Sequence, residues 1–302
     1  MNTRDVEAFL AVVETGSIVA ASARLNLTQP GVTRRIQSLE QVLGAELLDR
    51  ESKPLRPTAA GREAYEQGRR LIGVIEDLRS GVSPQREPSG EFRLGLTPYL
   101  SEPSLAAPID RLRRDFDKLD LRIVADWSLN LVERLERGEL DAAGVCLADG
   151  IEPPEGFAAS DLGAQPVLLV AARDRPIPQP ARLEDLARYP WIMNQDGCGF
   201  RGAIKRIFDA ARLPFQVGVE VLSPDLRLSL IARGIGIGLE TPAGLARSPF
   251  REAIRVIDAP NFRPKVRAWL IHREPAGRLA LPIGLFGDEL RKALDAAAAA
   301  HV

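Results

Sequence analysis

Apolar residues recur at helical spacing in three stretches of the first 45 residues. In residues 4–15 they stand at positions i, i+3, i+4 and i+7, which predicts an amphipathic helix. Gly16 breaks this helix, and Ser17 is suited to cap a short second helix. Thr28 is suited to cap a third helix, which tolerates a proline in its first turn and ends at Gly44. Three helices of this length, the last two joined by a tight turn, predict a helix-turn-helix.

The pattern changes after the third helix. Residues 47–58 contain two prolines and a polar centre, which predict a short hairpin or wing. Thr58 is suited to cap a longer helix that runs to about Ser80, and its narrow apolar stripe indicates a helix that pairs with a second copy of itself. That stripe consists of Ala64, Leu71, Ile72, Ile75 and Leu78. Residues 83–90 have the composition of a linker, so we place a domain boundary there.

The remaining residues alternate short apolar runs with helical stretches. Strands are expected over residues 91–96, 121–127, 141–147, 167–172, 191–194, 217–221, 235–239 and 266–272. Helices are expected over residues 105–116, 129–137, 201–211, 224–233 and 282–300. Such alternation predicts parallel sheets with crossover helices, and two successive sets predict two α/β lobes.

The predicted architecture is therefore a winged helix-turn-helix dominated by α-helices, then a linker helix, then an α/β domain. We assign residues 1–58 to the first, residues 59–89 to the linker helix and hinge, and residues 90–302 to the α/β domain. The first lobe would comprise about 90–162 and 266–302, and the second about 163–265. Ligands of such sheets bind where loops leave the carboxyl ends of the strands, which predicts a site between the lobes.

Composition narrows the possible functions. The chain has 302 residues and a net charge of −1, so a surface for nucleic acid has to be a local patch. Its apolar runs are far shorter than the roughly 20 residues that span a bilayer, and its start lacks the pattern of a signal peptide. We therefore expect a cytoplasmic protein with no membrane partner. Two cysteines and two histidines leave little for a disulfide framework, a metal site or histidine-driven catalysis, so we expect no cofactor, no metal and no enzyme.

The third helix carries side chains suited to reading DNA near its start. Gln pairs with adenine, Arg with guanine, and Thr with either base type or a thymine methyl group. Gln29, Pro30 and Thr33 share one face, with Arg34 beside them. Arg35 is better placed for a phosphate. The start of a recognition helix is the part that contacts base edges in the major groove, so these positions are candidates for base contacts.

The predicted wing adds Arg50, Lys53 and Arg56, which suit backbone phosphates or the minor groove. The alternative is that all of these are ordinary solvated residues, because residues 1–57 hold seven basic and seven acidic side chains. Five of the seven basic residues fall between Arg34 and Arg56, whereas three of the acidic ones lie on the first predicted helix. This distribution favours DNA binding.

A combination of motifs within residues 6–64 points the same way. The motifs are Phe9-x-x-Val12, Gly16-Ser17, Ala21-Ser22-x-Arg24-Leu25, Leu27-Thr28-Gln29-Pro30-Gly31-Val32-Thr33-x-x-Ile36, Leu39-Glu40, Leu43-Gly44, Leu47-x-x-Arg50 and Pro57-Thr58-x-Ala60-Gly61. This combination resembles the LysR-type transcriptional regulators. The departures from the family's usual pattern are Ser22, Thr33, Leu48 and Lys53. Lys53 stands where arginine is frequent, which weakens a bidentate or minor-groove role there.

The resemblance implies a winged helix-turn-helix, a linker helix that pairs two chains, and an effector domain of two Rossmann-like lobes similar to periplasmic binding proteins. It also implies double-stranded promoter or operator DNA as a partner, assembly as a homodimer or homotetramer, and a small-molecule effector that shifts DNA bending. By position, Gln29, Pro30, Thr33 and Arg34 would read bases, and Lys53 would lie in the wing.

By the same resemblance, the effector contacts follow the strands of both lobes. They are Thr97, Pro98, Tyr99, Trp127, Ser128, Asn194, Cys198, Phe200, Arg201, Ser223, Glu240 and Thr241. Ser128 and Ser223 are suited to cap helices, whose free N–H groups attract carboxylates or phosphates. Arg201 would clamp an anion, unless it is an ordinary surface residue or pairs with Glu240 across the cleft. The three aromatic residues would suit an aromatic or apolar organic acid, unless Trp127 belongs to the lobe core.

Two other features have simpler interpretations. The Gly-rich run 234–238 follows a helix, the reverse of the order in a phosphate-binding loop, so we interpret Gly234 as a helix C-cap. Redox sensing at Cys198 is conceivable, but we expect Cys146 in the other lobe and interpret Cys198 as a pocket or packing residue. Two alternative functions remain: a DNA-binding regulator without an effector, and an enzyme or solute-binding protein that uses the α/β domain.

Overall fold

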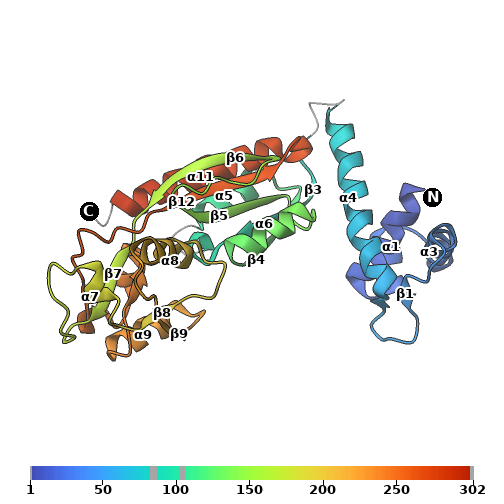
Figure 1. Ribbon diagram of the computed structural model, residues 1–302. Helices are drawn as coiled ribbons and strands as arrows, with labels where there is room; N and C mark the ends of the chain where they lie inside the picture. Colours follow the sequence, from blue (N-terminus) through green and yellow to red (C-terminus); the bar gives the residue numbers. More distant parts are fainter. Residues whose placement is uncertain (1, 82–86, 102–105, 300–302) are drawn as a thin grey trace. The chain divides into compact units, whose positions relative to one another are not determined.

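The computed structural model describes residues 2–81, 87–101 and 106–299. The chain divides into two compact units, Met1–Arg86 and Glu87–Val302, and each is described by itself (Figure 1). Within the described residues, no helix is both long enough and apolar enough to cross a bilayer.

The first unit is helical apart from a two-stranded wing. Its elements are α1 (Thr3–Thr15), α2 (Ile18–Arg24), α3 (Gln29–Leu43), β1 (Leu48–Asp49), β2 (Arg56–Pro57) and α4 (Ala59–Gly81). The caps lie where the sequence predicts them. The side chains of Ser17 and Thr28 accept hydrogen bonds from the first turns of α2 and α3. Gly16 and Gly44 end α1 and α3 with φ angles of 66° and 67°, a region that favours glycine. The predicted helix-turn-helix and wing are therefore confirmed.

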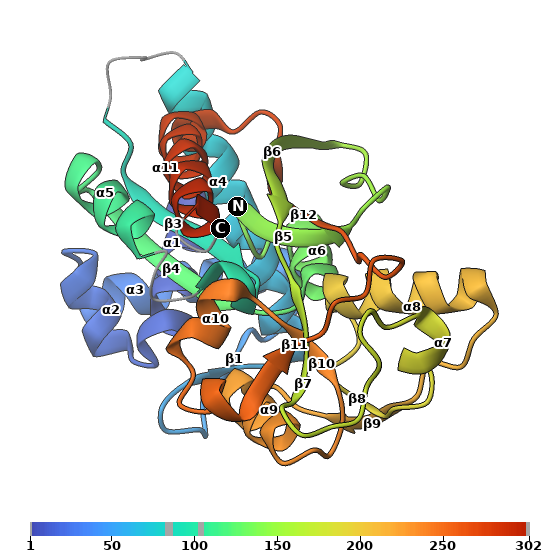
Figure 2. The same cartoon turned by 90° about the vertical axis from the view of Figure 1, so that its left-hand side faces the viewer.

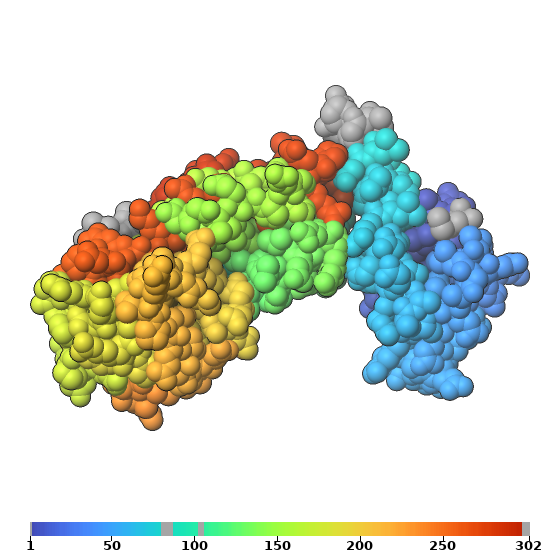
Figure 3. Space-filling model, viewed as in Figure 1, coloured from blue at the N-terminus to red at the C-terminus, as the bar shows by residue number. Residues whose placement is uncertain are grey.

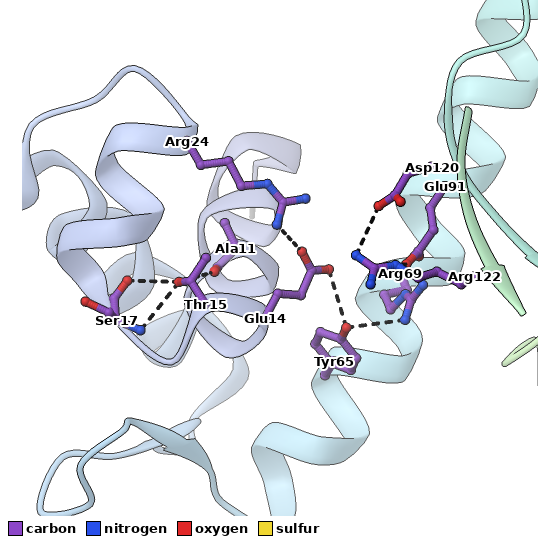
Figure 4. A network of polar contacts seen from close by, with 10 residues as sticks. All are labelled: Ala11, Glu14, Thr15, Ser17, Arg24, Tyr65, Arg69, Glu91, Asp120 and Arg122. Carbon is purple, nitrogen blue, oxygen red and sulfur yellow. Dashed lines mark hydrogen bonds and ion pairs between the residues drawn. The ribbon is translucent and has the colours of Figure 1, made fainter. Parts of the chain in front are cut away.

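Polar contacts as well as apolar packing join α4 to the other helices of this unit. Tyr65 on α4 donates a hydrogen bond to Glu14 on α1 at 3.4 Å, and the same carboxylate pairs with Arg24 on α2 (Figure 4). Arg69 donates to the Tyr65 hydroxyl at 3.3 Å. Burial raises the pKa of Tyr65 above its usual value, so the phenol stays protonated. One carboxylate therefore links three helices.

The apolar stripe of α4 is only partly available to a second copy. Ala64, Leu71 and Ile72 pack against the unit's own core around Phe9. The exposed large apolar side chains in the described part of this helix are Val74 and Leu78, at 65% and 67% exposure. The predicted stripe therefore serves mainly the first unit itself, and the face left for pairing is smaller than the sequence suggests.

The second unit begins with a five-stranded sheet in the order β4-β3-β5-β12-β6. The strands are β3 (Gly90–Leu96), β4 (Leu119–Ala125), β5 (Ala142–Ala148), β6 (Phe157–Gln165) and β12 (Val266–Arg273). β3 is parallel to β4 and β5, whereas β12 is antiparallel to β5 and β6. The helices of this first lobe are α5 (Ala107–Asp115), α6 (Ser128–Glu136) and α11 (Ala280–Ala299). α5 and α11 pack on one face, and α6 packs on the other (Figures 1 and 2).

The second lobe is built on a smaller sheet in the order β10-β7-β11 and a parallel pair, β8-β9. Its strands are β7 (Leu168–Ala172), β8 (Trp191–Met193), β9 (Val217–Glu220), β10 (Gly238–Glu240) and β11 (Ile254–Val256). Its helices are α7 (Leu183–Leu186), α8 (Gly199–Ala211), α9 (Pro224–Ala232) and α10 (Pro242–Arg247). The described part of this unit also contains 3₁₀ turns at Pro98–Ser101, Arg251–Ala253 and Gly277–Leu279. Figure 3 shows the second lobe, in yellow to orange, beside the green and red segments of the first.

Two α/β lobes are confirmed, but the expectation of parallel sheets is only partly right. β7 is antiparallel to both its neighbours, and β12 returns to the first sheet antiparallel to β5. Strands β6 and β11 and helices α7 and α10 were not predicted. β6 holds small and polar residues without alternation, and Gly163 within it has a φ of 92°, so it carries no strand pattern. It runs to Gln165, three residues past the expected lobe boundary.

The remaining expectations about single residues and segments have different outcomes. Arg233 is the C-cap of α9, and Gly234, the C-cap expected from the sequence, is the next residue, with a φ of 73°. Trp127, expected at the end of a strand, is instead the residue before α6. The expected helix over 105–116, the linker over 83–90 and the last helix each extend partly into residues that lie outside the described ranges.

Candidate functional site

The start of α3 presents the predicted DNA-reading residues at the surface. The hydroxyl oxygen of Thr28 accepts a hydrogen bond from the Gly31 N–H at 3.2 Å, which fixes the first turn. Gln29, Pro30 and Arg34 are exposed. Thr33 is half-buried, and its hydroxyl donates to the Gln29 carbonyl at 3.0 Å. Within the described residues, the Gln29 amide and the Arg34 guanidinium make no hydrogen bond or ion pair, so both can bind an external partner.

Arg35 and Arg50 already have partners in the first unit. Arg35 donates to the Arg4 carbonyl at 3.3 Å. Arg50 pairs with Glu40 at 2.9 Å, and the other oxygen of that buried carboxylate accepts the Leu47 N–H at 2.9 Å. Arg50 therefore holds the wing against α3, a role that its position in the sequence does not reveal.

Lys53 and Arg56 are the wing cations whose side chains can bind an external partner. Both are exposed, and no hydrogen bond or ion pair to another described residue engages either side chain. The wing also contacts the turn between α1 and α2, where the Leu55 N–H donates to the Gly16 carbonyl at 2.9 Å. This contact fixes the wing relative to the helix-turn-helix.

The second unit contains a cavity of about 100 Å³ between its two lobes. Ten of the twelve expected effector residues line it, namely Thr97, Pro98, Tyr99, Trp127, Ser128, Asn194, Cys198, Phe200, Glu240 and Thr241. Tyr99 and Phe200 meet edge to face, with ring centroids 5.7 Å apart. The buried Trp127 both lines the cavity and packs in the lobe, so its two proposed roles coincide. Arg201 and Ser223 lie outside the cavity lining.

A buried ion pair lies in the cavity wall. Arg227 on α9 donates to Glu240 at the end of β10 at 2.8 Å, and also to the side-chain oxygen of Asn194. The second oxygen of Glu240 accepts the Thr241 N–H at 2.8 Å. Arg227 and Glu240 are only 8% and 5% exposed, and Arg227 Nε has no partner within the described residues. Arg227 is not among the residues expected from the sequence; the signal available there is a lone cation flanked by Leu226 and Leu228.

Arg201 pairs with acidic residues other than the expected Glu240. Its guanidinium donates to Glu220 at 2.8 Å and pairs with Asp196 at 3.0 Å. It also donates to the Asn194 carbonyl at 3.0 Å. Arg201 is therefore paired with two carboxylates beside α8, lies outside the cavity lining, and is not the partner of Glu240.

The two serines expected to cap helices differ. Ser223 does cap α9, because its hydroxyl accepts the Leu226 N–H at 3.3 Å. Ser128 is the first residue of α6 rather than its cap. Its hydroxyl donates to the Cys146 carbonyl at 2.9 Å and accepts the Cys146 N–H at 3.0 Å. Ser128 therefore ties α6 to β5, and its hydroxyl hydrogen is not available to a ligand.

The two cysteines line the same cavity, contrary to the expectation that separate lobes keep them apart. Cys146 comes from β5, and Cys198 immediately precedes α8. The Asn194 amide donates to Cys198 Sγ at 3.4 Å, and Thr97 Oγ1 lies 3.8 Å from Cys146 Sγ. Burial raises the pKa of the Cys146 thiol to about 12, so at neutral pH it is a thiol and a poor nucleophile.

The raised pKa of Cys146 predicts a loss of stability in alkali. The unfolded chain releases this proton above the ordinary value of 9.0, whereas the native chain retains it until about pH 12. Because the native state then binds more protons, the free energy of unfolding falls with rising pH in this window, by about 2 kcal/mol at about pH 10.5. Urea unfolding of the chain and of Cys146→Ala measures this. The variant should lose less stability between about pH 8 and about pH 10.5; equal losses would contradict the assignment.

α8 starts in close contact with β5. A Cβ atom on Gly199 would lie 2.1 Å from the Cys146 carbonyl oxygen, whereas one on Gly202 in the same helix would meet nothing within 4 Å. We expect Gly199→Ala to lower the unfolding free energy by about 3 kcal/mol, because backbone atoms would have to move. Gly202→Ala should be neutral or raise stability by about 0.5–1 kcal/mol. Thermal and urea unfolding compare the pair, and equal effects would exclude this packing.

Comparison with known proteins identifies both units. The family described as "LysR substrate binding domain" matches residues 85–295, and "Bacterial regulatory helix-turn-helix protein, lysR family" matches residues 3–62. A hydrogen peroxide-inducible genes activator of Pectobacterium carotovorum is 28% identical over 282 residues, which is 90% of each chain. The transcriptional activator CmpR of Synechocystis is 23% identical and covers 94% of this chain and 93% of its own.

Solved structures show the same fold. A variant of full-length OxyR from Pseudomonas aeruginosa aligns with a TM-score of 0.70 at 19% identity, over 96% of this chain and 95% of its own. Full-length CbnR in complex with its target DNA aligns with a TM-score of 0.61 at 22% identity, over 97% and 100%. The chain belongs to the LysR family. It is a LysR-type DNA-binding transcriptional regulator with a C-terminal effector-binding domain.

Proposed function

We propose that Gln29 and Arg34 at the start of α3 read base edges in the major groove, with Pro30 and Thr33 in contact beside them. The single observation that supports this most is that both polar side chains are exposed and unpaired within the described residues. Thr28 caps α3 and so places the first turn of the helix at the DNA. Arg35 lies near the DNA backbone, and Lys53 and Arg56 of the wing bind DNA phosphates. Arg50 supports the wing rather than contacting DNA directly.

Loss of the Arg34 guanidinium should weaken specific binding. We expect Arg34→Ala to cost about 1–3 kcal/mol on an operator fragment recovered from genomic DNA, and to relax base preference at one position. Arg113→Ala, which removes one exposed cation from α5, is the matched control and should leave affinity unchanged. Fluorescence anisotropy at fixed salt measures both. Equal affinities for the operator in the chain and in Arg34→Ala would refute the proposed docking.

We propose further that the cavity between the lobes binds a small, uncharged effector. The cavity of about 100 Å³ is smaller than the roughly 150 Å³ that holds benzene in an engineered core. The cation in its lining, Arg227, is neutralised by Glu240 at 2.8 Å. An organic acid would have to displace that carboxylate, so these observations favour a neutral polar molecule over the aromatic acid expected from Tyr99, Trp127 and Phe200.

The effector proposal is tested with the full chain on its operator. Small neutral polar compounds and matched carboxylates of up to about six non-hydrogen atoms are screened for a rise in melting temperature, which mass action predicts for any ligand of the native state. Hits are then added to the operator complex. A neutral hit that changes the footprint supports the proposal. Hits confined to carboxylates, or hits that leave the footprint unchanged, would overturn it.

A response to peroxide is a second candidate, favoured by the presence of both cysteines in one cavity. It would parallel the role that the Pectobacterium relative is named for, activation of hydrogen peroxide-inducible genes. The Cys198 thiolate would attack one peroxide oxygen; the O–O bond breaks, hydroxide leaves and is protonated to water, and Cys198 becomes a sulfenic acid. Because the Cys146 pKa is raised to about 12, closure of a Cys146–Cys198 disulfide with loss of a second water should be slow.

Mass spectrometry of peroxide-treated protein with a sulfenic-acid trap tests the second candidate. The trap should label Cys198 in the chain and in Cys146→Ser, and nothing in Cys198→Ser. Absence of label at Cys198 at peroxide concentrations that leave the methionines unoxidised would reject the candidate.

We propose assembly as a homodimer or homotetramer, because Val74 and Leu78 leave an exposed apolar face on α4. We also propose that the chain acts in the cytoplasm and turns no substrate over. His272 engages the Arg273 carbonyl at 2.8 Å and does not line the cavity. The side chains recorded in contact with the Cys146 and Cys198 thiols are Thr97 and Asn194, and neither is a general base.

A further inference from the structure

A second, larger cavity lies against the two segments that connect the lobes. Its volume is about 370 Å³, within the range of small-molecule sites. The chain passes from the first lobe to the second at residues 166–167, after β6, and returns at residues 257–265, after β11. Both connections line this cavity, which we call the hinge cavity. A molecule bound there would touch both points at which the lobes pivot.

The hinge cavity has an apolar floor and a donor-rich rim. Leu169, Ile257 and Phe262 line it and belong to the core of the second lobe. Arg263 and Lys265 also line it, both are exposed, and neither side chain has a partner among the described residues. The acidic residue in the lining is Asp258. Two cations against one carboxylate leave a net positive rim beside apolar walls, a combination that suits an anion with an apolar body.

Gln165 adds a buried donor. It is 7% exposed, lines the hinge cavity, and donates one amide hydrogen to the Gly163 carbonyl at 3.0 Å. A primary amide carries two hydrogens, and the second has no acceptor within the described residues. A buried donor without a partner gains free energy when a ligand supplies an acceptor.

The hinge cavity shares part of its wall with the cavity between the lobes described above, which we call the effector cavity. Val167 and Leu239 line both. The hydroxyl of Tyr99, which lines the effector cavity, donates to the side-chain oxygen of Gln165 at 2.9 Å. A ligand in either cavity therefore contacts side chains that also define the other, so occupancy of one site changes the surroundings of the second.

We propose that the hinge cavity is a second ligand site, which binds a small organic carboxylate with an apolar body. The carboxylate contacts Arg263, Lys265 and the free hydrogen of Gln165, and the apolar part lies on Phe262 and Leu169. A ligand that bridges both connections favours the arrangement of the lobes seen here and thereby modulates the effector cavity. The site does not depend on the proposed neutral effector, because Gln165, Arg263 and Lys265 line the hinge cavity and not the other cavity.

The test uses the full chain and hexanoate, with hexan-1-ol as a neutral probe of equal chain length. Isothermal titration should give saturable binding of hexanoate and binding at least about tenfold weaker for hexan-1-ol, since the charge contributes. The double variant Arg263→Gln with Lys265→Met should weaken hexanoate binding about tenfold or more. The matched control, Arg113→Gln with Lys292→Met on α5 and α11, removes the same two charges elsewhere and should bind as the chain does.

Amide hydrogen exchange locates the bound probe. Hexanoate should slow exchange in residues 165–169 and 257–265, because ligand binding suppresses local opening. Three outcomes would overturn the proposal: no hexanoate binding to the full chain, equal loss in the double variant and its control, or protection confined to residues of the effector cavity.

Discussion

Replacing Arg227 with methionine should cost the second unit about 3–5 kcal/mol of stability, because it leaves the Glu240 carboxylate buried without its cation. Glu240 is 5% exposed, and its Oε2 accepts from Arg227 at 2.8 Å. Asn194 would also lose the guanidinium that now donates to its side chain. Urea unfolding monitored by tryptophan fluorescence measures the loss, since Trp127 and Trp191 both lie in this unit. The same variant should alter the effector response, because Arg227 lines the cavity.

A double variant separates the ion pair from simple loss of packing. Arg227→Met combined with Glu240→Gln removes both charges and keeps an acceptor for the Thr241 N–H. Replacing both partners of a buried pair is often close to neutral, so most of the lost stability should return, to within about 1–2 kcal/mol of the original chain. If the double variant is as unstable as Arg227→Met alone, the cost arises from packing, and the electrostatic account of the cavity fails.

Gly61→Ala is expected to disrupt the first unit. A Cβ atom at this position would lie 2.0 Å from the Leu47 carbonyl oxygen and 3.1 Å from the Pro57 side chain. Leu47 precedes the wing, and its backbone groups are held by Glu40 and Thr58, so it cannot move away cheaply. We expect a loss of about 3 kcal/mol or more, beyond ordinary overpacking, and operator affinity lowered at least tenfold.

Gly73→Ala in the same helix is the matched control. A Cβ atom there meets nothing within 4 Å, and alanine favours a helix over glycine by about 0.5–1 kcal/mol. This variant should therefore be as stable as the chain or more so, with unchanged operator binding. A stable, DNA-binding Gly61→Ala protein would show that α4 does not start against Leu47 as described.

The local features of the first unit could be predicted from sequence because they depend on neighbours in the chain. A cap such as Thr28 needs only the N–H three residues later, and Gly44 needs only the turn that it ends. β6 could not be predicted, since it is held by pairing with β12, about 100 residues away, rather than by its own pattern.

The residues that line the cavity between the lobes show the same limit of prediction from sequence. The resemblance to the family correctly placed ten residues in the cavity lining. It did not predict the ion pair of Arg227 with Glu240, which forms only because the fold brings α9 close to the end of β10. Arg201, which looked like the anion-binding residue, lies beside Glu220 and Asp196 once α8 and β9 are placed. Cys146 and Cys198 line one cavity because α8 starts against β5, a contact between lobes that no spacing encodes.

The central claim is that α3 reads specific DNA sites, and recovery of genomic fragments tests it most directly. The full chain, Arg34→Ala and Arg113→Ala are each incubated with sheared genomic DNA, and the bound pools are sequenced. We predict enrichment of a few sites with inverted-repeat symmetry by the chain and by Arg113→Ala, and loss of that enrichment in Arg34→Ala. Equal, sequence-independent recovery by all three proteins would contradict the claim.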